Sequence, residues 1–230
     1  MEKPVIDVLI PAYNEERSIG LVIDDLPKDL LRHIIVCDNN SSDSTGEVAR
    51  QHGALVVHAP EKGYGNACLT GMKYLKSLKQ CPDILVFIDG DYSDYPEQLP
   101  RVVKPIISHD VDLVIGSRAL GRQEPGAMEV HQRFGNWLAT RLIRIVYDYH
   151  CTDLGPFRAI KWDKLMELNM IDTNFGWTVE MQVKAAKRKL VTEEVAVDYK
   201  PRIGVSKVSG TIKGSVLAGH KIIWTIFKYL

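Results

Sequence analysis

The sequence predicts a single α/β domain, built on a mostly parallel sheet with helices on both faces. Short apolar runs of about five residues alternate with helical patterns through the first half of the chain. Such alternation is typical of βαβ units, whose crossover helices cover both faces of a parallel sheet. The 230 residues suffice for one substantial core, and the chain contains no internal repeat, low-complexity tract or linker.

The elements of the first half follow in regular order. Each apolar run is short enough for a buried strand, and each intervening segment carries apolar residues at helical spacing. Strands are expected at 5–10, 33–37, 54–58, 84–88 and 111–115, with helices at 15–26, 44–51, 64–78 and from 96 to about 108. In a sheet of this kind, ligands bind beyond the carboxyl ends of the strands.

The second half is less regular. Residues 117–130 form a Gly- and Pro-containing loop, long enough to have a function. An amphipathic helix is expected at 131–149, because Phe134, Leu138, Leu142 and Ile145 recur at helical spacing. The remaining expected elements are a loop at 151–157, a short strand, helices at about 163–168 and 177–189, an alternating strand at 191–199, a loop at 200–210 and a helix at 211–230.

Composition and charge narrow the class of protein. Hydrophobic residues make up 45% and charged residues 25%, which excludes a mostly disordered chain. The formal net charge is zero, so nothing indicates a nucleic-acid partner. Residues 1–130 nevertheless hold 13 basic and 20 acidic residues, and residues 131–230 hold 16 and 9. This asymmetry suggests metal or base binding in the first part and an anionic ligand or membrane surface in the second, unless the charges simply fall unevenly.

The cysteines and the N-terminus favour a reducing, cytosolic compartment. Cys37, Cys68, Cys81 and Cys151 form neither a C-x-x-C pair nor a zinc-binding spacing. The N-terminus has only a short apolar run before proline and acidic residues, unlike a signal peptide. No uncharged apolar stretch reaches the roughly 18 residues that a transmembrane helix needs.

The strongest chemical signal is Asp89-Gly90-Asp91, directly after the fourth strand. Residues two apart in extended chain point the same way, so the two carboxylates can act together. Carboxylate oxygens are hard ligands suited to Mg²⁺ or Mn²⁺, and a few such ligands plus substrate phosphates are a common arrangement. Asp-Gly-Asp is also a common turn sequence, but its place at a strand end favours the metal site.

Three more polar clusters lie where strands end or helices begin. Asp38 ends the second strand and can accept an N–H of a nucleotide base, whereas Asp43 suits the cap of the next helix. Tyr13 follows the first strand and can stack on a base, and Asn14 can cap the helix after it. The Gly-rich turn 62–66 could receive phosphate or ribose oxygens on its backbone N–H groups, although an ordinary helix start is the simpler explanation.

In chain order, IPAYNEE, VCDNNSSDST, KGYGNA, FIDGDYSDYP and DLVIGSR resemble the motifs of glycosyltransferase family 2, whose fold is GT-A type and Rossmann-like. The similarity is close over residues 4–118 and looser to about 210. Within the family, the chain most resembles the dolichyl- or polyprenyl-phosphate sugar synthases. The resemblance implies a domain at 1–210, with a nucleotide-sugar-binding half (1–118) and an acceptor-binding half (119–210), followed by an amphipathic helix (211–230).

The resemblance also implies the reaction and its residues. The donor would be a UDP- or GDP-sugar, with Mg²⁺ or Mn²⁺ at Asp89 and Asp91, and transfer would invert the anomeric carbon. The catalytic candidates are Asp91, Asp153, Glu180 and Arg118. The candidates for holding the nucleotide sugar are Pro11, Tyr13, Glu15, Asp38, Gly63, Asn66, Asp89, Gly90, Arg202 and Lys207.

The acceptor is either a hydroxyl or a lipid phosphate. A hydroxyl must lose its proton in the transition state, so Glu180 or Asp153 would have to act as the base. A lipid phosphate is already anionic, and cations such as Arg118, Arg202 and Lys207 would then matter more. The basic last hundred residues favour the lipid phosphate. Pro156 stands where the family usually has Gly before its Phe-Arg pair, so this loop departs from the family's pattern.

Other interpretations stay open at this point. Glu180 is equally well explained as a solvated helix residue, whereas a water-facing loop is the less favoured explanation of Arg202 and Lys207. A non-catalytic module that binds nucleotide sugar is a different class of function, against which the intact Asp-x-Asp argues. A nucleotidyltransferase usually carries a Gly-rich loop with Arg and Lys after its first strand, where this chain has 11–16.

The last helix is rich in apolar and aromatic residues and carries Lys221 and Lys228. That composition suits a helix lying on an anionic membrane, which would hold the protein at the cytosolic face as a peripheral enzyme. A helix that packs on the core, or on a second copy in a homo-oligomer, explains the same pattern equally well.

Overall fold

The structure, a computed structural model, describes residues 3–204 and 212–230. Its strands are β1 (Ile6–Ala12), β2 (His33–Asp38), β3 (Leu55–His58), β4 (Ile84–Phe87), β5 (Leu113–Ser117), β6 (Arg158–Lys161) and β7 (Thr192–Ala196). Its α-helices are α1 (Ile19–Asp25), α2 (Thr45–Gln51), α3 (Tyr64–Ser77), α4 (Leu99–His109), α5 (Val130–Tyr147), α6 (Trp162–Leu168), α7 (Trp177–Lys187) and α8 (Ile212–Lys228). Two short 3₁₀ turns, η1 (Lys28–Leu30) and η2 (Pro96–Gln98), complete the described elements.

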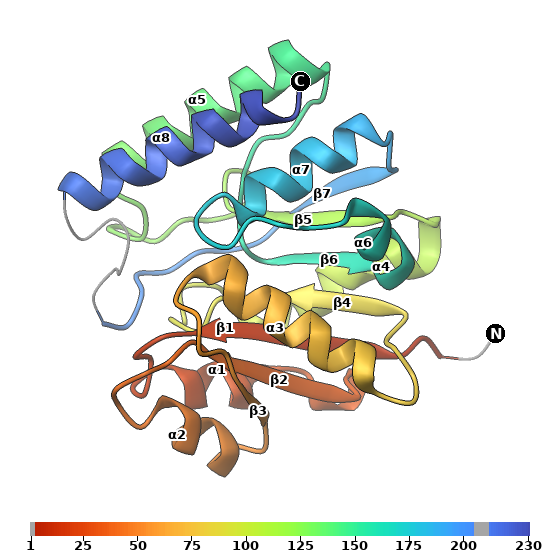
Figure 1. Cartoon of the computed structure of the whole chain (residues 1–230), viewed down its shortest axis with the longest axis vertical. Coiled ribbons are helices and arrows are strands. Elements are labelled where there is room, and N and C mark those ends of the chain that lie inside the picture. Colours follow the sequence, from red (N-terminus) through yellow and green to blue (C-terminus); the bar gives the residue numbers. More distant parts are fainter. Residues whose placement is uncertain (1–2, 205–211) are drawn as a thin grey trace.

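One sheet joins the seven strands in the order β3-β2-β1-β4-β6-β5-β7 (Figure 1). The strands β3, β2, β1 and β4 are parallel to their neighbours, and β5 is parallel to β7. Only β6 runs antiparallel to both of its neighbours. The predicted α/β fold with a mostly parallel sheet is therefore confirmed.

Alternating side chains of β1 divide between two cores, one on each face of the sheet. Val8 and Ile10 belong to the core beneath α1 and α4. Leu9 points the other way, into the core beneath α3, α6 and α7. Because both faces are covered by helices, the central strands are apolar at almost every position, which explains their continuous hydrophobic runs.

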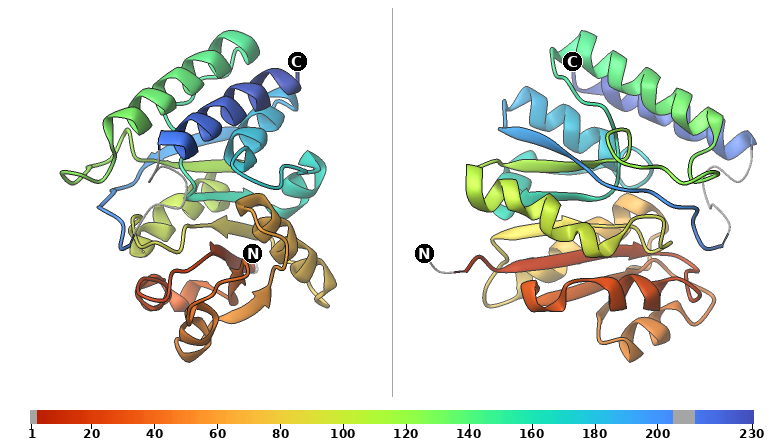
Figure 2. Two further views of the ribbon diagram at one scale, coloured as in Figure 1. Left: turned by 60° about the vertical axis from the view of Figure 1, so that its left-hand side comes forward. Right: turned by 180° about the vertical axis from the view of Figure 1, so that it is seen from behind.

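Two long helices form an additional layer beyond α7. α5 and α8 lie side by side at the end of the molecule away from β3 (Figures 1 and 2). They pack on α7 through a small third core that includes Ala139, Ile143, Val183 and Ile226. Within residues 3–204 and 212–230, no helix combines the length and the hydrophobicity needed to cross a bilayer.

Some boundaries differ from those expected, for local reasons. The first helix starts at Ile19 instead of residue 15, because Asn14 adopts a left-handed conformation (φ 54°) and Glu15 opens a turn. Residues 96–98 form a 3₁₀ turn before α4. The strand expected at 191–199 is shorter, since Tyr199 leaves β7 and pairs with the backbone of Asp94 and Gln123.

The strand order creates a crevice between β1 and β4. The chain leaves β1 toward β2 on one side of the sheet, whereas β4 lies on the other side. The loops after these two neighbouring parallel strands therefore diverge, and space opens beyond their carboxyl ends. The polar segments 11–15 and 89–91 both lie at this point of the sheet.

Candidate functional site

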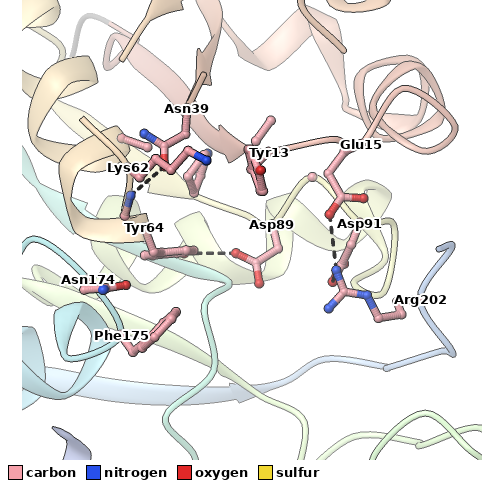
Figure 3. A pocket seen from close by; sticks show the side chains of 15 residues that line it. Tyr13, Glu15, Asn39, Lys62, Tyr64, Asp89, Asp91, Asn174, Phe175 and Arg202 are labelled. Carbon is pink, nitrogen blue, oxygen red and sulfur yellow. Dashed lines mark hydrogen bonds and ion pairs between the residues drawn. The ribbon is translucent and has the colours of Figure 1, made fainter. Parts of the chain in front are cut away.

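A cavity of about 340 Å³ occupies this crevice (Figure 3). Its walls come from the ends of β1, β2 and β4, the start of α3, the loop before α7 and the loop after β7. The lining residues are Pro11, Ala12, Tyr13, Glu15, Asn39, Lys62, Gly63, Tyr64, Ala67, Asp89, Gly90, Asp91, Asn174, Phe175 and Arg202.

The structure brings together most, but not all, of the residues predicted for this site. Those that line the cavity are Pro11, Tyr13, Glu15, Gly63, Asp89, Gly90, Asp91 and Arg202. Asp38 and Asn66 lie beside it without lining it, and Lys207 lies outside the described residues. Arg118, Asp153 and Glu180 lie elsewhere, in places described below.

Asp89 and Asp91 form the acidic centre of the cavity. The hydroxyl of Tyr64 donates to Oδ1 of Asp89 at 2.9 Å. Ser93 donates to Oδ1 of Asp91 through its backbone N–H at 3.0 Å and its hydroxyl at 2.5 Å. Burial, and secondly the charge of Asp91, raise the pKa of Asp89 to about 7.

Two nearby carboxylates in a poorly solvated cavity fit a hard divalent cation. After burial, the charge of Asp91 is the second cause of the raised pKa of Asp89, and a bound cation would relieve this repulsion. Mg²⁺ and Mn²⁺ accept such a pair when substrate phosphates supply further oxygen ligands. Asp89 and Asp91 are thus the residues that would hold the metal.

Arg202 already neutralises part of this acidic centre. Its Nη2 lies 3.2 Å from a carboxylate oxygen of Glu15 and 3.2 Å from one of Asp91. The backbone holds the arginine in place, since Ile203 donates its N–H to the carbonyl of Asp91 at 3.0 Å. A cation bound by Asp91 would therefore compete with this guanidinium for the same carboxylate.

The opposite end of the cavity combines an aromatic ring with polar groups. The Lys62 ammonium lies 5.4 Å from the centroid of the Tyr13 ring. Asn39 donates to the carbonyls of Ala59 and Glu61 at 3.1 and 2.7 Å, and accepts the N–H of Gly63 at 2.7 Å. The Tyr13 ring thus provides a flat surface that suits a nucleotide base, and the hydrogen bonds of Asn39 hold the turn beside it in place.

Asp38 was the sequence candidate for base recognition, but Asn39 is the residue of this turn that lines the cavity. Oδ1 of Asp38 accepts the N–H of Ser41 at 3.0 Å. The role of Asp38 in base binding stays a prediction. Asn39 was missed because the sequence does not reveal which of two consecutive polar residues turns inward at a strand end.

The loop before α7 supplies Asn174 and Phe175, which the sequence analysis also missed. This loop packs directly on the start of α3, where Asn66 donates its N–H to the carbonyl of Thr173 at 3.0 Å. A Cβ atom at Gly65 would lie 1.9 Å from the carbonyl oxygen of Asp172, so only glycine allows this approach. Contacts between segments more than 100 residues apart leave no signal in either segment alone.

Arg118 and Asp153 form a buried ion pair. Nε and Nη2 of Arg118 donate to the two carboxylate oxygens of Asp153 at 2.8 and 2.7 Å, and the Arg118 N–H donates at 2.8 Å. The guanidinium also lies 5.0 Å from the centroid of the Tyr199 ring. Burial would raise the pKa of Asp153, but the charge and hydrogen bonds of Arg118 outweigh it and lower that pKa.

Glu180 has a structural position that neither sequence interpretation anticipated. Its carboxylate is fully buried and lines neither cavity, so it is not a solvated helix residue. It accepts the N–H groups of Ile171 and Asp172 at 3.1 and 2.7 Å, and pairs with Lys184 at 2.7 Å. The hydroxyl of Tyr229 donates to it at 2.5 Å, so Glu180 ties the loop before α7 to the end of the chain.

A second cavity, of about 330 Å³, is lined by Asp153 of the Arg118–Asp153 pair. Its cationic side chains are those of Arg133, Arg141 and Arg144, all from α5, and His150 lines it as well. The remaining lining residues are Ala119, Gln123, Met128, Asn136, Trp137, Thr140, Cys151 and Thr152. The sequence analysis named none of these cations as candidates.

Asp94 is a further buried carboxyl close to the acidic centre. It has no hydrogen-bond partner among the described residues. Burial, followed by the charge of Asp89, raises its pKa well above the usual range. Asp94 lines neither cavity, so it is not placed to act as a base on a ligand bound in them.

Comparison with known proteins identifies the family. Residues 7–169 match the family described as glycosyl transferase family 2. The chain belongs to glycosyl transferase family 2. This confirms the resemblance found in the motifs, and the protein is a glycosyltransferase.

Relatives of known sequence and structure agree with this assignment. An uncharacterised glycosyltransferase of Mycobacterium tuberculosis is 34% identical over 222 residues, covering 95% of this chain and 96% of that protein. The undecaprenyl-phosphate mannosyltransferase of Micrococcus luteus is 32% identical over 228 residues, with 91% and 89% covered. Glucosyl-3-phosphoglycerate synthase of M. tuberculosis, solved with Mn²⁺, UDP and its product, shares the fold with a TM-score of 0.78, 22% identity and coverages of 98% and 80%.

Proposed function

We propose that this glycosyltransferase moves a sugar from UDP- or GDP-sugar to the phosphate of a membrane-borne polyprenyl or dolichyl lipid, with inversion at the anomeric carbon. The donor would lie in the first cavity, and the acceptor phosphate in the second. In the same proposal, residues 1–118 serve the donor and 119–210 the acceptor. The mannosyltransferase of M. luteus supports the lipid phosphate, because its name gives undecaprenyl phosphate as the acceptor.

The observation that carries the proposal is that neither candidate base is free. Asp153 is bound through both carboxylate oxygens to Arg118, and its pKa is lowered. Glu180 is buried against backbone N–H groups, Lys184 and Tyr229. A hydroxyl acceptor needs a carboxylate that can take a proton, whereas a phosphate acceptor does not.

The arrangement of the cations supports the same acceptor. Arg133, Arg141 and Arg144 project from one helix into the second cavity, where a phosphate would find several N–H donors. Arginine is suited to this task because its planar guanidinium binds phosphate oxygens in pairs. A sugar or glycolipid hydroxyl would need no such concentration of positive charge.

In the reaction we propose, an oxygen of the acceptor phosphate attacks the anomeric carbon from the face opposite the diphosphate. The bond between that carbon and the diphosphate oxygen breaks, and the nucleoside diphosphate leaves with the electron pair. A divalent metal at Asp89 and Asp91 would balance the charge of the departing diphosphate. Arg202 is a second cation within reach of that group, and Tyr13 would stack on the base.

Calorimetry with UDP and with GDP tests the donor site. We expect one nucleotide to bind in the presence of Mn²⁺, and binding to disappear with EDTA. The Mn²⁺ and UDP bound by glucosyl-3-phosphoglycerate synthase support a nucleotide–metal site in this fold, and UDP is the nucleotide we would try first. Failure of both nucleotides to bind to the folded protein would overturn the proposed donor.

The acceptor is tested with two lipids that differ only in whether the head group is a phosphate or a hydroxyl. Radiolabelled nucleotide sugar is offered with polyprenyl phosphate or with the polyprenol of the same chain length. We expect label in the lipid phase with the phosphate only. Transfer to the polyprenol would instead establish a hydroxyl acceptor, and nucleotide binding without transfer to any lipid would leave a non-catalytic binding module.

The proposed acceptor also implies a place of action. A lipid phosphate lies at a bilayer surface, so we propose that the enzyme works as a peripheral protein at the cytosolic face, with α8 in contact with the membrane. A homo-oligomer assembled through the same helix is the competing use of this surface. Both are distinguished in the experiment that follows.

A further inference from the structure

More than half of the large apolar side chains exposed in the described residues lie on α5, on α8 or at Leu230. Of the fourteen large apolar side chains exposed in the described parts, eight belong to α5, to α8 and to Leu230. All the exposed Phe and Trp residues among the fourteen are in this group. Phe134 is 59% exposed, Trp137 53% and Trp224 57%. So concentrated a patch marks a surface for binding rather than a random scatter of apolar side chains.

The same helices are strongly cationic. Neither the sequence of α5 nor that of α8 contains Asp or Glu, although Glu129 and Asp148 flank α5. α5 carries Arg133, Arg141 and Arg144, all three exposed in part, and α8 carries Lys213, Lys221 and Lys228. An apolar stripe bordered by arginine and lysine is the composition of helices that lie at the surface of an anionic bilayer.

The apolar surface is continuous with the second cavity. Trp137 lines the cavity and is half exposed, and its ring centroid lies 5.8 Å from that of Phe134. Arg133 and Arg141 also line the cavity from the exposed side of α5. An anionic head group in the cavity would therefore have its apolar chain beside Phe134 and Trp137.

We propose that α5 and α8 together form a face that docks on anionic lipid bilayers, and that α5, not the C-terminal helix alone, inserts the aromatic anchors Phe134 and Trp137. Docking in this orientation sets the second cavity at the lipid surface. The link to an acceptor rests on the proposed function, whereas docking itself is tested without acceptor or donor.

Charge favours a bilayer over a second copy of the chain. A symmetric dimer through this face would bring α5 and α8 against the same two helices of the partner. Arg133, Arg141, Arg144 and Lys228 would then meet the same cations of the partner, and neither helix carries an acid to compensate them. Lys221 is already paired with Asp172 at 2.8 Å. An anionic membrane supplies the missing charge.

The fluorescence of the tryptophans reports whether this face contacts lipid. The chain has four, of which Trp137 and Trp224 lie on the proposed face and Trp162 and Trp177 are buried. The full chain is mixed with phosphatidylcholine vesicles, with or without phosphatidylglycerol, whose acyl chains carry bromine as a quencher. We expect quenching with the anionic vesicles, reduced by about half in Trp137→Phe and in Trp224→Phe, and absent in the double variant.

Vesicle co-sedimentation separates the contribution of each surface. Phe134→Ser should weaken binding to anionic vesicles about tenfold, because an aromatic side chain that would be buried in the bilayer is lost. Arg144→Gln should weaken it about fivefold and reduce the preference for anionic lipid. Ile107→Ser on α4, also an exposed apolar residue but outside the face, is the matched control and should bind as the unmodified protein does.

Three results would overturn the proposal. Quenching that persists in the double tryptophan variant would assign contact to another surface. If Phe134→Ser and Ile107→Ser weaken vesicle binding equally, α5 has no specific role in docking. A stable dimer in sedimentation velocity that Phe134→Ser dissociates, without quenching by vesicles, would assign the face to a second copy of the chain.

Docking on a bilayer and the proposed glycosyl transfer can be tested separately. The vesicles above contain no polyprenyl phosphate, so docking is measured even if no transfer occurs. With a short, water-soluble prenyl phosphate as acceptor, Phe227→Ser, on α8 and not among the residues that line the second cavity, should keep its transfer rate while losing transfer to the vesicle-borne lipid. Loss with both acceptors would indicate a role of Phe227 in the reaction instead.

Discussion

The two cavities differ in the sign of their charge. The first is built at strand ends around Asp89, Asp91 and Glu15, with Arg202 as the cation that bridges two of them. The second is built on α5 around three arginines, and its one carboxylate, Asp153, is neutralised by Arg118. An acidic site needs a cation before it can accept an anionic ligand, whereas a basic site accepts one directly. The predictions below test this difference.

The largest effect is expected where a buried charge loses its partner. Asp153→Asn leaves the Arg118 guanidinium buried without a counter-charge, which should lower the free energy of unfolding by about 3 kcal/mol or more. Urea denaturation measures it. The double variant Arg118→Met with Asp153→Leu, which removes both charges, should recover part of the loss. Additive losses would mean that the two residues do not act as a pair.

Asp91→Ala should abolish function at the first cavity while sparing the second. Metal-dependent nucleotide binding should weaken at least about a hundredfold, because one of the two carboxylates that would hold the metal is lost. Calorimetry measures that loss, and co-sedimentation with anionic vesicles serves as the control. A simultaneous loss of vesicle binding would contradict the separation of the two sites.

Glu180→Gln separates a structural role from a catalytic one. The variant should lower the free energy of unfolding by about 2 kcal/mol, since several donors around a buried carboxylate lose their charged acceptor. Transfer by the folded protein should change by less than about threefold, because Glu180 lines neither cavity. Glu167→Gln breaks only an exposed ion pair with Lys164 and is the stability control. If the Glu180→Gln enzyme is stable but inactive, this would support Glu180 as the catalytic base.

The raised pKa of Asp89 predicts how metal binding depends on pH. Because that pKa is about 7, the carboxyl takes up a proton as the pH falls through 7, and a protonated carboxyl does not bind the metal. Mn²⁺ affinity should therefore fall about tenfold per pH unit below 7 and level off above 8. Tyr64→Phe removes a hydrogen bond that lowers this pKa and should move the midpoint upward. An unchanged midpoint would assign the titration to another group.

The smallest effect is expected at Arg202, and its sign depends on the ligand. Without nucleotide, Arg202→Ala should tighten Mn²⁺ binding a few-fold, because the guanidinium no longer competes for Asp91. With nucleotide and metal present, binding of the diphosphate should weaken by a similar factor, since a cation is lost. Calorimetry of both titrations tests the prediction. The same sign in both would show that Arg202 does not exchange between carboxylate and diphosphate.

The first cavity was largely predictable because its residues follow strands directly. Asp89, Asp91 and Glu15 lie within a few residues of the strand that carries them, and parallel strands deliver their ends to one edge of the sheet. Asn174 and Phe175 escaped prediction, since their loop reaches the cavity only through its contact with Gly65. Glu180 occupies a motif position that suggested chemistry, and its carboxylate is buried against the Asp172 N–H, Lys184 and Tyr229.

The sequence by itself determined the alternation of strands and helices, the carboxylate pair after β4 and the division into an acidic and a basic part. Each of these is local, because it depends on spacing over a few residues or on composition. Only the tertiary structure decided that Arg118 and Asp153 neutralise each other, that Arg202 reaches Asp91 and that α5 joins α8 in one cationic apolar face. These contacts join residues 35 to more than 100 positions apart, and which partners meet depends on the packing of the whole sheet and its helices.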